Sequence, residues 1–335
     1  MRKVVSKVEQ KRKEGSFHGD RRRVSRVVVI GAGNVGATYA YALLISGLVS
    51  EIVVLDRDEA RLRGHVMDLN HGVSFVRPVI VRAGDYEDGR EADLIVITAG
   101  AAQKVGETRL DLVHRNVGIF KEIIPQIMAT GTNAPFLIAT NPVDVMTYAA
   151  LKLSGLPKNR VIGSGTVLDT ARFRYLLSEH CQIDPSNVHA YIIGEHGDSE
   201  VPVWSLANIA GMRFSEYCPV CGKNCGPLRK QQIFEEVKNA AYEIIKGKGS
   251  TYYAIGLALV QITEAILRNE FSVLTVSSLL EGEYGINDVC LSLPSVVCRE
   301  GISKRIDLKL SAEEEEQLRQ SAEVIKAVCK EIDLS

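Results

Sequence analysis

Three side chains in the second half of this sequence have the types and spacing needed for acid–base chemistry on a small carboxylate. Asp169 and Arg172 lie three apart in a segment that is predicted to be a helix beginning near Thr166, so they share one face. His196 follows an expected strand and is flanked by glycines. Imidazole carries protons near neutral pH, a carboxylate on one ring nitrogen favours the protonated ring, and arginine binds a carboxylate through paired hydrogen bonds. Beside a nicotinamide, this set suits reduction of a 2-keto acid, although each residue alone is equally compatible with a structural role.

A glycine-rich turn near the start of the chain indicates where a nicotinamide cofactor would bind. The β-branched run at residues 26–30 predicts a strand buried on both faces, and it leads directly into Gly31-Ala32-Gly33-Asn34-Val35-Gly36. In a dinucleotide site the three glycines of this pattern make the tight turn, admit the pyrophosphate and let the helix pack closely. A second predicted strand, at 51–55, ends in Asp56, about 20 residues after the glycines, where a ribose-binding carboxylate is expected. We predict a dinucleotide site; the alternative is an ordinary glycine turn.

Asp56 also bears on which dinucleotide binds. A carboxylate there hydrogen-bonds the ribose hydroxyls and repels a phosphate, which favours NAD over NADP. The neighbouring Arg57 would soften this repulsion if it turned inward, but we expect it to point into solvent.

The order of expected elements predicts an α/β fold. Strands alternate with helices from Val27 onward, which indicates a parallel sheet with right-handed crossovers. The predicted strands after the first two lie at 79–81, 93–98, 136–140 and 161–163. Several of these strands end in small or polar residues that suit a ligand crevice, namely Thr98, Ala99, Gly100 and Asn141. Beyond residue 165 we predict a strand at 188–193, helices near 233–245 and at 252–267 and 311–330, and antiparallel strands at 273–280 and 288–293.

These elements suggest three regions: a basic N-terminal extension at 1–24, a dinucleotide-binding domain of Rossmann type at 25–164, and an α+β substrate domain at 165–335. The extension has two clusters of lysine and arginine. A solvated or subunit-embracing tail is the favoured interpretation over a nucleic-acid-binding arm, because no stacking aromatic residues accompany the charges.

Composition limits the class of protein. The 335 residues carry a net charge of −1, so no polyanionic partner is implied for the body of the chain, and we expect no nucleic acid partner. No apolar window is long enough to span a bilayer, and no secretion signal is evident, so no membrane role is expected. Seven cysteines in such a chain are expected to be reduced thiols in the cytoplasm.

Three of the cysteines are closely spaced: Cys218, Cys221 and Cys225. A closed zinc site needs four ligands, and only three are local. A histidine or cysteine from elsewhere could complete the set, but we predict no metal. We interpret the other cysteines, Cys181, Cys290, Cys298 and Cys329, as core or surface thiols.

Beyond these separate patterns, several motifs together resemble the lactate and malate dehydrogenase superfamily. The likeness covers nearly the whole chain after residue 24 and is carried by residues 31–36, 85–115, 141–144, 163–174, 188–197 and 250–253. It implies that His196 is the proton donor and acceptor, that Asp169 is its partner, and that Arg172 binds the substrate carboxylate. It further implies that Arg109 polarises the keto group and that Asn141 hydrogen-bonds near the reacting oxygen.

The segment from Thr98 to Arg109 follows a strand end and has Gly100 and Gly106 as possible hinges. Read alone, it suits a surface loop; with the resemblance, it suits a lid over the substrate. Malate-type members of the family place an arginine where this chain has Gln103, and lactate-type members place glutamine. A neutral amide cannot offset a second carboxylate, so the resemblance implies pyruvate and L-lactate as substrates. Thr251, also in the pocket by resemblance, leaves room for a methyl group and little more.

A second site is implied at Arg174 and His189. Arg174 lies about 200° round the helix from Arg172 and so cannot serve the same pocket. Both residues match positions at which bacterial lactate dehydrogenases bind fructose 1,6-bisphosphate between subunits; the alternative is a structural role at the surface. The family also implies a homotetramer. The rival functions are a malate or other L-2-hydroxy-acid dehydrogenase, and a non-catalytic NAD-binding protein that kept the fold.

Overall fold

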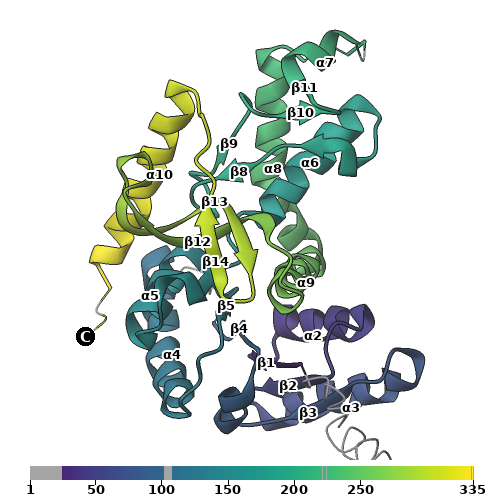
Figure 1. The fold of residues 1–335 in the computed structure, drawn as a ribbon, viewed down its shortest axis with the longest axis vertical. Coiled ribbons are helices and arrows are strands. Elements are labelled where there is room, and N and C mark those ends of the chain that lie inside the picture. The colour runs from purple at the N-terminus through teal and green to yellow at the C-terminus, as the bar shows by residue number, and fades with distance from the viewer. Residues whose placement is uncertain (1–24, 102–107, 221, 224, 333, 335) are drawn as a thin grey trace, which may run out of the picture.

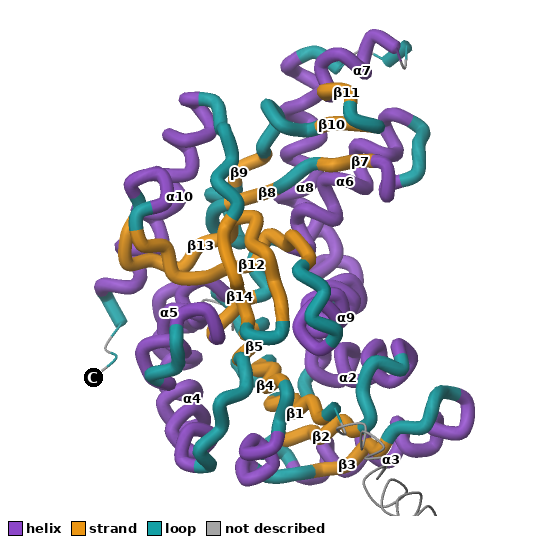
Figure 2. Tube along the Cα trace, viewed as in Figure 1, coloured by secondary structure: helices purple, strands orange, loops and turns teal. Residues whose placement is uncertain are grey.

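The structure is a computed structural model that describes residues 25–101, 108–220, 222–223, 225–332 and 334. Within these residues one nine-stranded sheet runs through the molecule in the order β14-β13-β12-β6-β5-β4-β1-β2-β3 (Figures 1 and 2). Six strands are parallel: β1 (Arg26–Ile30), β2 (Glu51–Leu55), β3 (Ile80–Ala83), β4 (Leu94–Ile97), β5 (Phe136–Ile138) and β6 (Val161–Gly163). Three are antiparallel: β12 (Ser272–Glu281), β13 (Asn287–Cys298) and β14 (Gly301–Arg305).

The apolar run of β1 is buried on both faces, as the sequence predicts. Val27 and Val29 belong to one hydrophobic core, whereas Val28 and Ile30 belong to the core on the other side of the sheet. Successive side chains of a strand point to opposite faces, so an uninterrupted apolar run requires helices on both sides.

Two groups of helices meet this requirement (Figure 1). The first group contributes to one core and consists of α4 (Arg109–Ala129), α5 (Val143–Ser154) and α10 (Ala312–Lys330). The second group contributes to the other core and consists of α2 (Asn34–Ser46), α3 (Glu59–Gly72) and α9 (Tyr253–Leu267). These observations confirm the predicted α/β class, with a mostly parallel sheet enclosed between helices.

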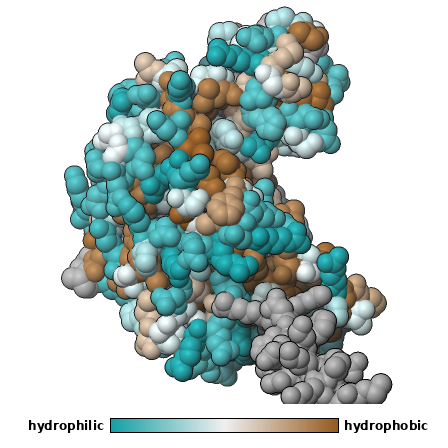
Figure 3. All heavy atoms as spheres, viewed as in Figure 1, coloured by the Kyte–Doolittle hydropathy of each residue, from teal (hydrophilic) through white to brown (hydrophobic). Residues whose placement is uncertain are grey.

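A separate lobe has its own core, which contains Phe173, Leu177, Phe214 and Ile233. In the space-filling view a hollow separates this lobe from the half of the molecule that carries α2 and α3 (Figure 3). The lobe is built from α6 (Val167–Cys181), α7 (Phe214–Val220) and α8 (Pro227–Lys248), with β7 (Val188–His189), β10 (Asn208–Ile209) and β11 (Met212–Arg213). Two further short strands, β8 (Ile192–Ile193) and β9 (Val201–Pro202), pair with each other.

The prediction of a single strand at 188–193 is wrong. The structure divides it into β7 and β8, because its two ends pair with different partners: Val188 faces Ile209 of β10, and Ile192 faces Pro202 of β9. Helices α5 and α7 and strand β14 were not predicted.

The expectation that all the cysteines are reduced is also wrong for two of them. Cys218 and Cys225 form a disulfide, because the turn after α7 brings their Cα atoms to 6.0 Å, a separation that a disulfide can bridge. Among the described residues, Cys181, Cys290, Cys298 and Cys329 keep their thiols, and the first three of them are buried. None of the described helices has the length and apolar character required to cross a bilayer.

Candidate active site

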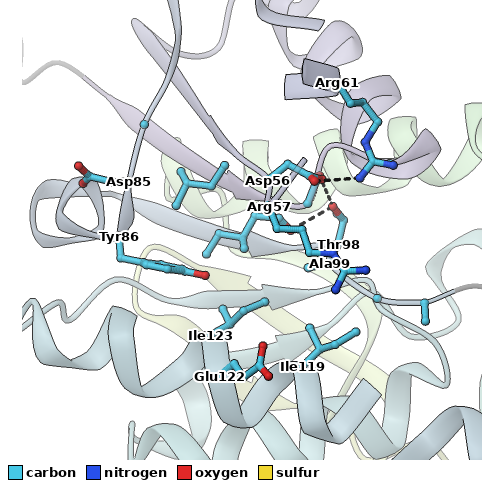
Figure 4. Close-up of a pocket in the computed structure, with 17 residues that line it drawn as sticks. Asp56, Arg57, Arg61, Asp85, Tyr86, Thr98, Ala99, Ile119, Glu122 and Ile123 are labelled. Carbon is cyan, nitrogen blue, oxygen red and sulfur yellow. Dashed lines mark hydrogen bonds and ion pairs between the residues drawn. The ribbon is translucent and has the colours of Figure 1, made fainter. Parts of the chain in front are cut away.

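A cavity of about 560 Å³ opens at the carboxyl ends of β1, β2 and β4 (Figure 4). Its lining includes seven of the residues that the sequence assigns to the dinucleotide site: Gly31, Gly33, Asp56, Arg57, Thr98, Ala99 and Gly100. Three further residues of the glycine-rich turn, Asn34, Val35 and Gly36, form the first turn of α2. Asn34 donates a hydrogen bond to Ser250 at 2.8 Å, which ties the turn to the segment just before α9.

Two glycines in this turn are required by the backbone. Gly31 has φ +106°, and a Cβ there would lie 2.5 Å from the Ala99 nitrogen. A Cβ on Gly36 would lie 1.9 Å from the Gly31 carbonyl oxygen, so only glycine lets α2 approach this closely. A Cβ on Gly33, by contrast, would meet open space within 4 Å, where a pyrophosphate can reach the start of the helix. The turn therefore fits a dinucleotide.

Asp56 is held in place by three donors. Its Oδ2 accepts a hydrogen bond from the Ala32 amide at 2.6 Å, and its Oδ1 accepts bonds from the Asp58 amide and from Arg61. Burial tends to raise the pKa of Asp56, but these donors outweigh it and leave the pKa below its ordinary value. The carboxylate is therefore charged at neutral pH. Arg57 is exposed, as expected, and the partner of Asp56 is Arg61, which the sequence analysis did not single out.

Apolar residues on the opposite wall of the cavity were also missed. Tyr86, Ile119 and Ile123 line it below Asp56 and offer an apolar surface to a flat ring (Figure 4). Ile119 and Ile123 lie one helical turn apart on α4. That spacing is the only signal in the sequence that could have identified them.

The predicted acid–base residues lie together at the start of α6. His196 Nδ1 is 2.5 Å from Asp169 Oδ2, and Arg172 Nη1 donates to Asp169 Oδ1 at 2.8 Å. The Asp169 side chain is only 3% exposed, whereas that of His196 is 23% exposed, so one buried carboxylate joins the imidazole to the guanidinium. Burial alone would lower the pKa of His196, but the Asp169 carboxylate raises it to about 9. The imidazole is therefore protonated at neutral pH.

The loop that carries His196 is fixed by a second buried carboxylate. Asp144 Oδ2 accepts the His196 backbone N–H at 2.8 Å, and its Oδ1 accepts the Ser277 hydroxyl at 2.5 Å. Burial raises the pKa of Asp144 to about 6. Glu195, the residue before His196, is fixed by a separate contact, because its amide donates a hydrogen bond to the Ser321 hydroxyl of α10. Asp144 lies in the 141–144 motif, from which no role was predicted for it; an acid inside the apolar sequence of α5 was the available signal.

Glu200 is a third buried acid near the pair, and the sequence analysis missed it. It is 6% exposed, and its Oε1 has no hydrogen-bond partner in the described part of the chain. Burial and the Asp169 carboxylate raise the pKa of Glu200 to about 8, although His196, Arg172 and Lys238 act in the opposite direction. Glu200 is therefore neutral at pH 7 and acquires a negative charge near His196 only in mild alkali.

We expect Glu200→Gln to change the pH profile but not the activity at pH 6. At pH 6 both side chains are neutral and similar in shape. Above pH 8 the natural carboxylate stabilises the His196 imidazolium, so its removal should lower the pKa of that imidazole and move the alkaline decline of kcat/KM for keto-acid reduction to lower pH, by up to about one unit. Profiles of kcat/KM between pH 6 and 10 measure this shift. Equal profiles for the natural protein and the variant would contradict the expectation.

The other predicted substrate residues are only partly described. Asn141 is exposed after the end of β5, and its carbonyl accepts a hydrogen bond from Asn116 at 2.8 Å. Thr251 is half-buried just before α9, beside the Ser250 that contacts the glycine-rich turn. Arg109 is the first residue of α4, but its side chain is not described, and Gln103 lies outside the described residues.

The residues assigned to a second site lie on neighbouring segments. Arg174 Nε donates to the Ala190 carbonyl at 3.0 Å, and its guanidinium lies over the Tyr191 ring. His189 precedes Ala190 and is exposed. Arg174 lines a cavity of about 290 Å³. This cavity is separate from the one beside Asp56.

Family models match both halves of the chain. Residues 25–163 match the lactate/malate dehydrogenase NAD binding domain, and residues 166–333 match the lactate/malate dehydrogenase alpha/beta C-terminal domain. The chain belongs to the lactate/malate dehydrogenase family. This confirms the predicted resemblance, and with it an NAD-dependent oxidoreductase whose cofactor is NAD.

Four similar lactate dehydrogenases are between 41% and 56% identical to this chain. The L-lactate dehydrogenase of Acetivibrio thermocellus is 56% identical over 311 residues, which is 93% of this chain and 98% of that protein. That of Thermoanaerobacterium saccharolyticum is 54% identical over 93% of this chain and its own full length. Among solved structures, the minor L-lactate dehydrogenase from Enterococcus mundtii matches with a TM-score of 0.90 at 41% identity, over 93% of this chain and 100% of that one. A lactate dehydrogenase from a Medee basin deep-sea metagenome library matches with a TM-score of 0.89 at 47% identity, over 92% and 98%.

Proposed function

We propose that this protein is an L-lactate dehydrogenase that interconverts pyruvate and L-lactate with NAD. The observation that carries the proposal is the bonding of one buried carboxylate, Asp169, to both His196 and Arg172. The protonated imidazole can give a proton to the keto oxygen of a 2-keto acid, and the guanidinium can bind its carboxylate. The L-lactate dehydrogenase names of its relatives support the same activity.

In the proposed reaction Arg172 binds the pyruvate carboxylate and so turns the keto carbon toward the cofactor cavity. NADH held in the cavity lined by Gly31, Gly33 and Asp56 would supply the hydride for that carbon. His196 gives its Nε2 proton to the keto oxygen, which becomes the hydroxyl of lactate, and the imidazole is left neutral. Asp169 holds Nδ1 protonated throughout and fixes the orientation of the ring. In lactate oxidation the neutral His196 takes the hydroxyl proton back.

The choice of pyruvate depends on two positions. Gln103 offers a neutral amide where a second substrate carboxylate would need a cation, and Thr251 leaves room for a methyl group. By the family resemblance, Arg109 polarises the keto group, and Asn141 hydrogen-bonds near the reacting oxygen. The alternative, a malate or other L-2-hydroxy-acid dehydrogenase, would require a larger or charged substrate to fit beside Gln103.

We further propose activation by fructose 1,6-bisphosphate at Arg174 and His189, in a homotetramer. Support comes from their closeness, since Arg174 binds the carbonyl of the residue after His189, and from exposed apolar side chains that a subunit contact would cover. These side chains lie on α2 and α9 and include Tyr41, Ile45 and Leu257. The cytoplasmic location and the domain division after residue 164 stay predictions.

A panel of 2-keto acids assayed with NADH, with and without fructose 1,6-bisphosphate, tests this proposal. We expect pyruvate to have the highest kcat/KM, since oxaloacetate would place a carboxylate beside a neutral amide at a cost of about 2 kcal/mol or more, roughly 30-fold. We also expect the bisphosphate to lower the KM for pyruvate and to promote assembly, measured by sedimentation. A higher kcat/KM for oxaloacetate would refute the pyruvate assignment. No effect of the bisphosphate on KM or on assembly would refute the effector site.

A further inference from the structure

Three metal-binding side chains meet in the lobe that carries α7. His180 lies in the last turn of α6, Cys218 lies in α7, and Cys225 lies just before α8. His180 Nε2 is 2.9 Å from the Cys225 sulfur, and the three donor atoms lie within 4.8 Å of one another. The sequence shows the closely spaced cysteines but does not reveal a ligand from elsewhere in the chain. The fold supplies it 38 residues before Cys218.

The disulfide alone does not require this arrangement. It joins Cys218 to Cys225 whether or not an imidazole is present, yet the His180 ring nitrogen faces one of its sulfurs. Cys218 is only 7% exposed, and the other two side chains are half-buried, so the donors converge at a partly enclosed place. Imidazole nitrogen and thiolate sulfur are the ligands that zinc prefers in proteins.

The spacing of these atoms also suits a tetrahedral ion. Zinc lies about 2.3 Å from sulfur and about 2.0 Å from nitrogen, so its ligand atoms are separated by roughly 3.5 Å. His180 Nε2 lies 2.9 Å from the Cys225 sulfur, and all three donor atoms lie within 4.8 Å of one another, so small side-chain shifts would reach that value.

We propose that His180, Cys218 and Cys225 bind a zinc ion when both cysteines are reduced, with a water molecule as the fourth ligand. A phosphine reductant and water convert the disulfide to two thiols while the phosphine is oxidised to its oxide, and each thiol then releases its proton as its sulfur binds the metal. The disulfide and the zinc complex are therefore alternative states of the same two sulfurs. Cys221 lies between them in the sequence but outside the described residues, so the structure assigns it no place.

The ion would have a structural role. It would join the end of α6 to α7 and to the start of α8, in a lobe whose α7 lies at the opposite end of the molecule from β1, β2 and β3 (Figure 1). We therefore expect its removal to loosen this lobe rather than to stop the reaction.

Metal analysis of the whole, untagged protein tests the proposal. The protein is reduced with a phosphine, freed of metal on a chelating resin, incubated with zinc chloride and desalted. We expect about one zinc ion per chain. His180→Gln and Cys225→Ser should each lower this content at least tenfold, whereas the matched variants His65→Gln and Cys329→Ser should keep it. Zinc should also raise the Tm of the natural protein but not that of His180→Gln.

Two results would overturn the proposal. The first is a protein whose thiols are shown by titration to be reduced and that still retains no zinc after desalting. The second is a zinc content that is the same in His180→Gln as in the natural protein. If Cys225→Ser does not fold, His180→Gln still decides the matter, since it keeps both cysteines. Cobalt gives an independent readout, because a thiolate-to-cobalt absorption band appears only if sulfur binds the ion.

Discussion

Replacing Asp169 by asparagine is expected to lower kcat/KM for pyruvate by about 10²- to 10⁴-fold at neutral pH. The carboxylate is what raises the pKa of His196 from 6.5 to about 9, against the effect of burial. Without it the pKa of the imidazole should fall to 6.5 or below, so that little of it carries the proton that reduction requires. Steady-state assays with NADH measure the loss.

The pH profile distinguishes this mechanism from simple damage to the fold. Keto-acid reduction needs protonated His196, so its kcat/KM should be level below about pH 9 in the natural protein and fall above it. In Asp169→Asn the fall should begin at least two units lower. Asp68→Asn, an exposed change on α3, is the matched control and should leave the profile intact. A variant of Asp169 that kept full activity and an unshifted profile would contradict the proposed role of this residue.

Replacing Arg172 by leucine is expected to lower kcat/KM for pyruvate by about 10²- to 10⁴-fold, mainly through a higher KM. A guanidinium contributes two charge-assisted hydrogen bonds to a carboxylate, each worth about 1.5–3 kcal/mol. Arg172 is only 14% exposed, so water cannot fully replace those bonds. Arg172→Lys should recover part of the loss, because a single ammonium keeps the charge but not the paired geometry.

Two measurements make this test specific. The affinity for NADH should be unchanged, since the dinucleotide cavity does not include Arg172. Arg213→Leu, which removes an exposed arginine from β11, should have a normal KM. If the KM for pyruvate stayed the same in Arg172→Leu while kcat fell, Arg172 would act through Asp169 and not on the substrate.

Local patterns predicted those parts of the molecule that short stretches of sequence determine. The strand at 26–30, the glycine-rich turn after it and the carboxylate at the end of β2 all depend on residues within one βαβ unit. The contact between Asp169 and Arg172 is similar, because it follows from their positions on one helix. The partnership of His196 with Asp169 spans 27 residues and came from family resemblance rather than from local pattern.

Distant contacts could not be predicted in this way. Asp144 lies 52 residues from His196 and 133 from Ser277, and nothing in its own neighbourhood indicates either partner. Glu200 looks like an ordinary acid after a turn, and nothing in its neighbouring sequence indicates that it is only 6% exposed in the folded chain. The division between β7 and β8 likewise depends on two partner strands that lie later in the chain.

The pairing of Ser277 in β12 with Gly163 in β6 joins strands from the two halves of the chain in a single sheet. The two halves of the chain therefore cannot move apart without breaking the backbone hydrogen bonds between β6 and β12. We therefore expect the entry and exit of small molecules to depend on loops outside the sheet, and not on a separation of the two halves of the chain.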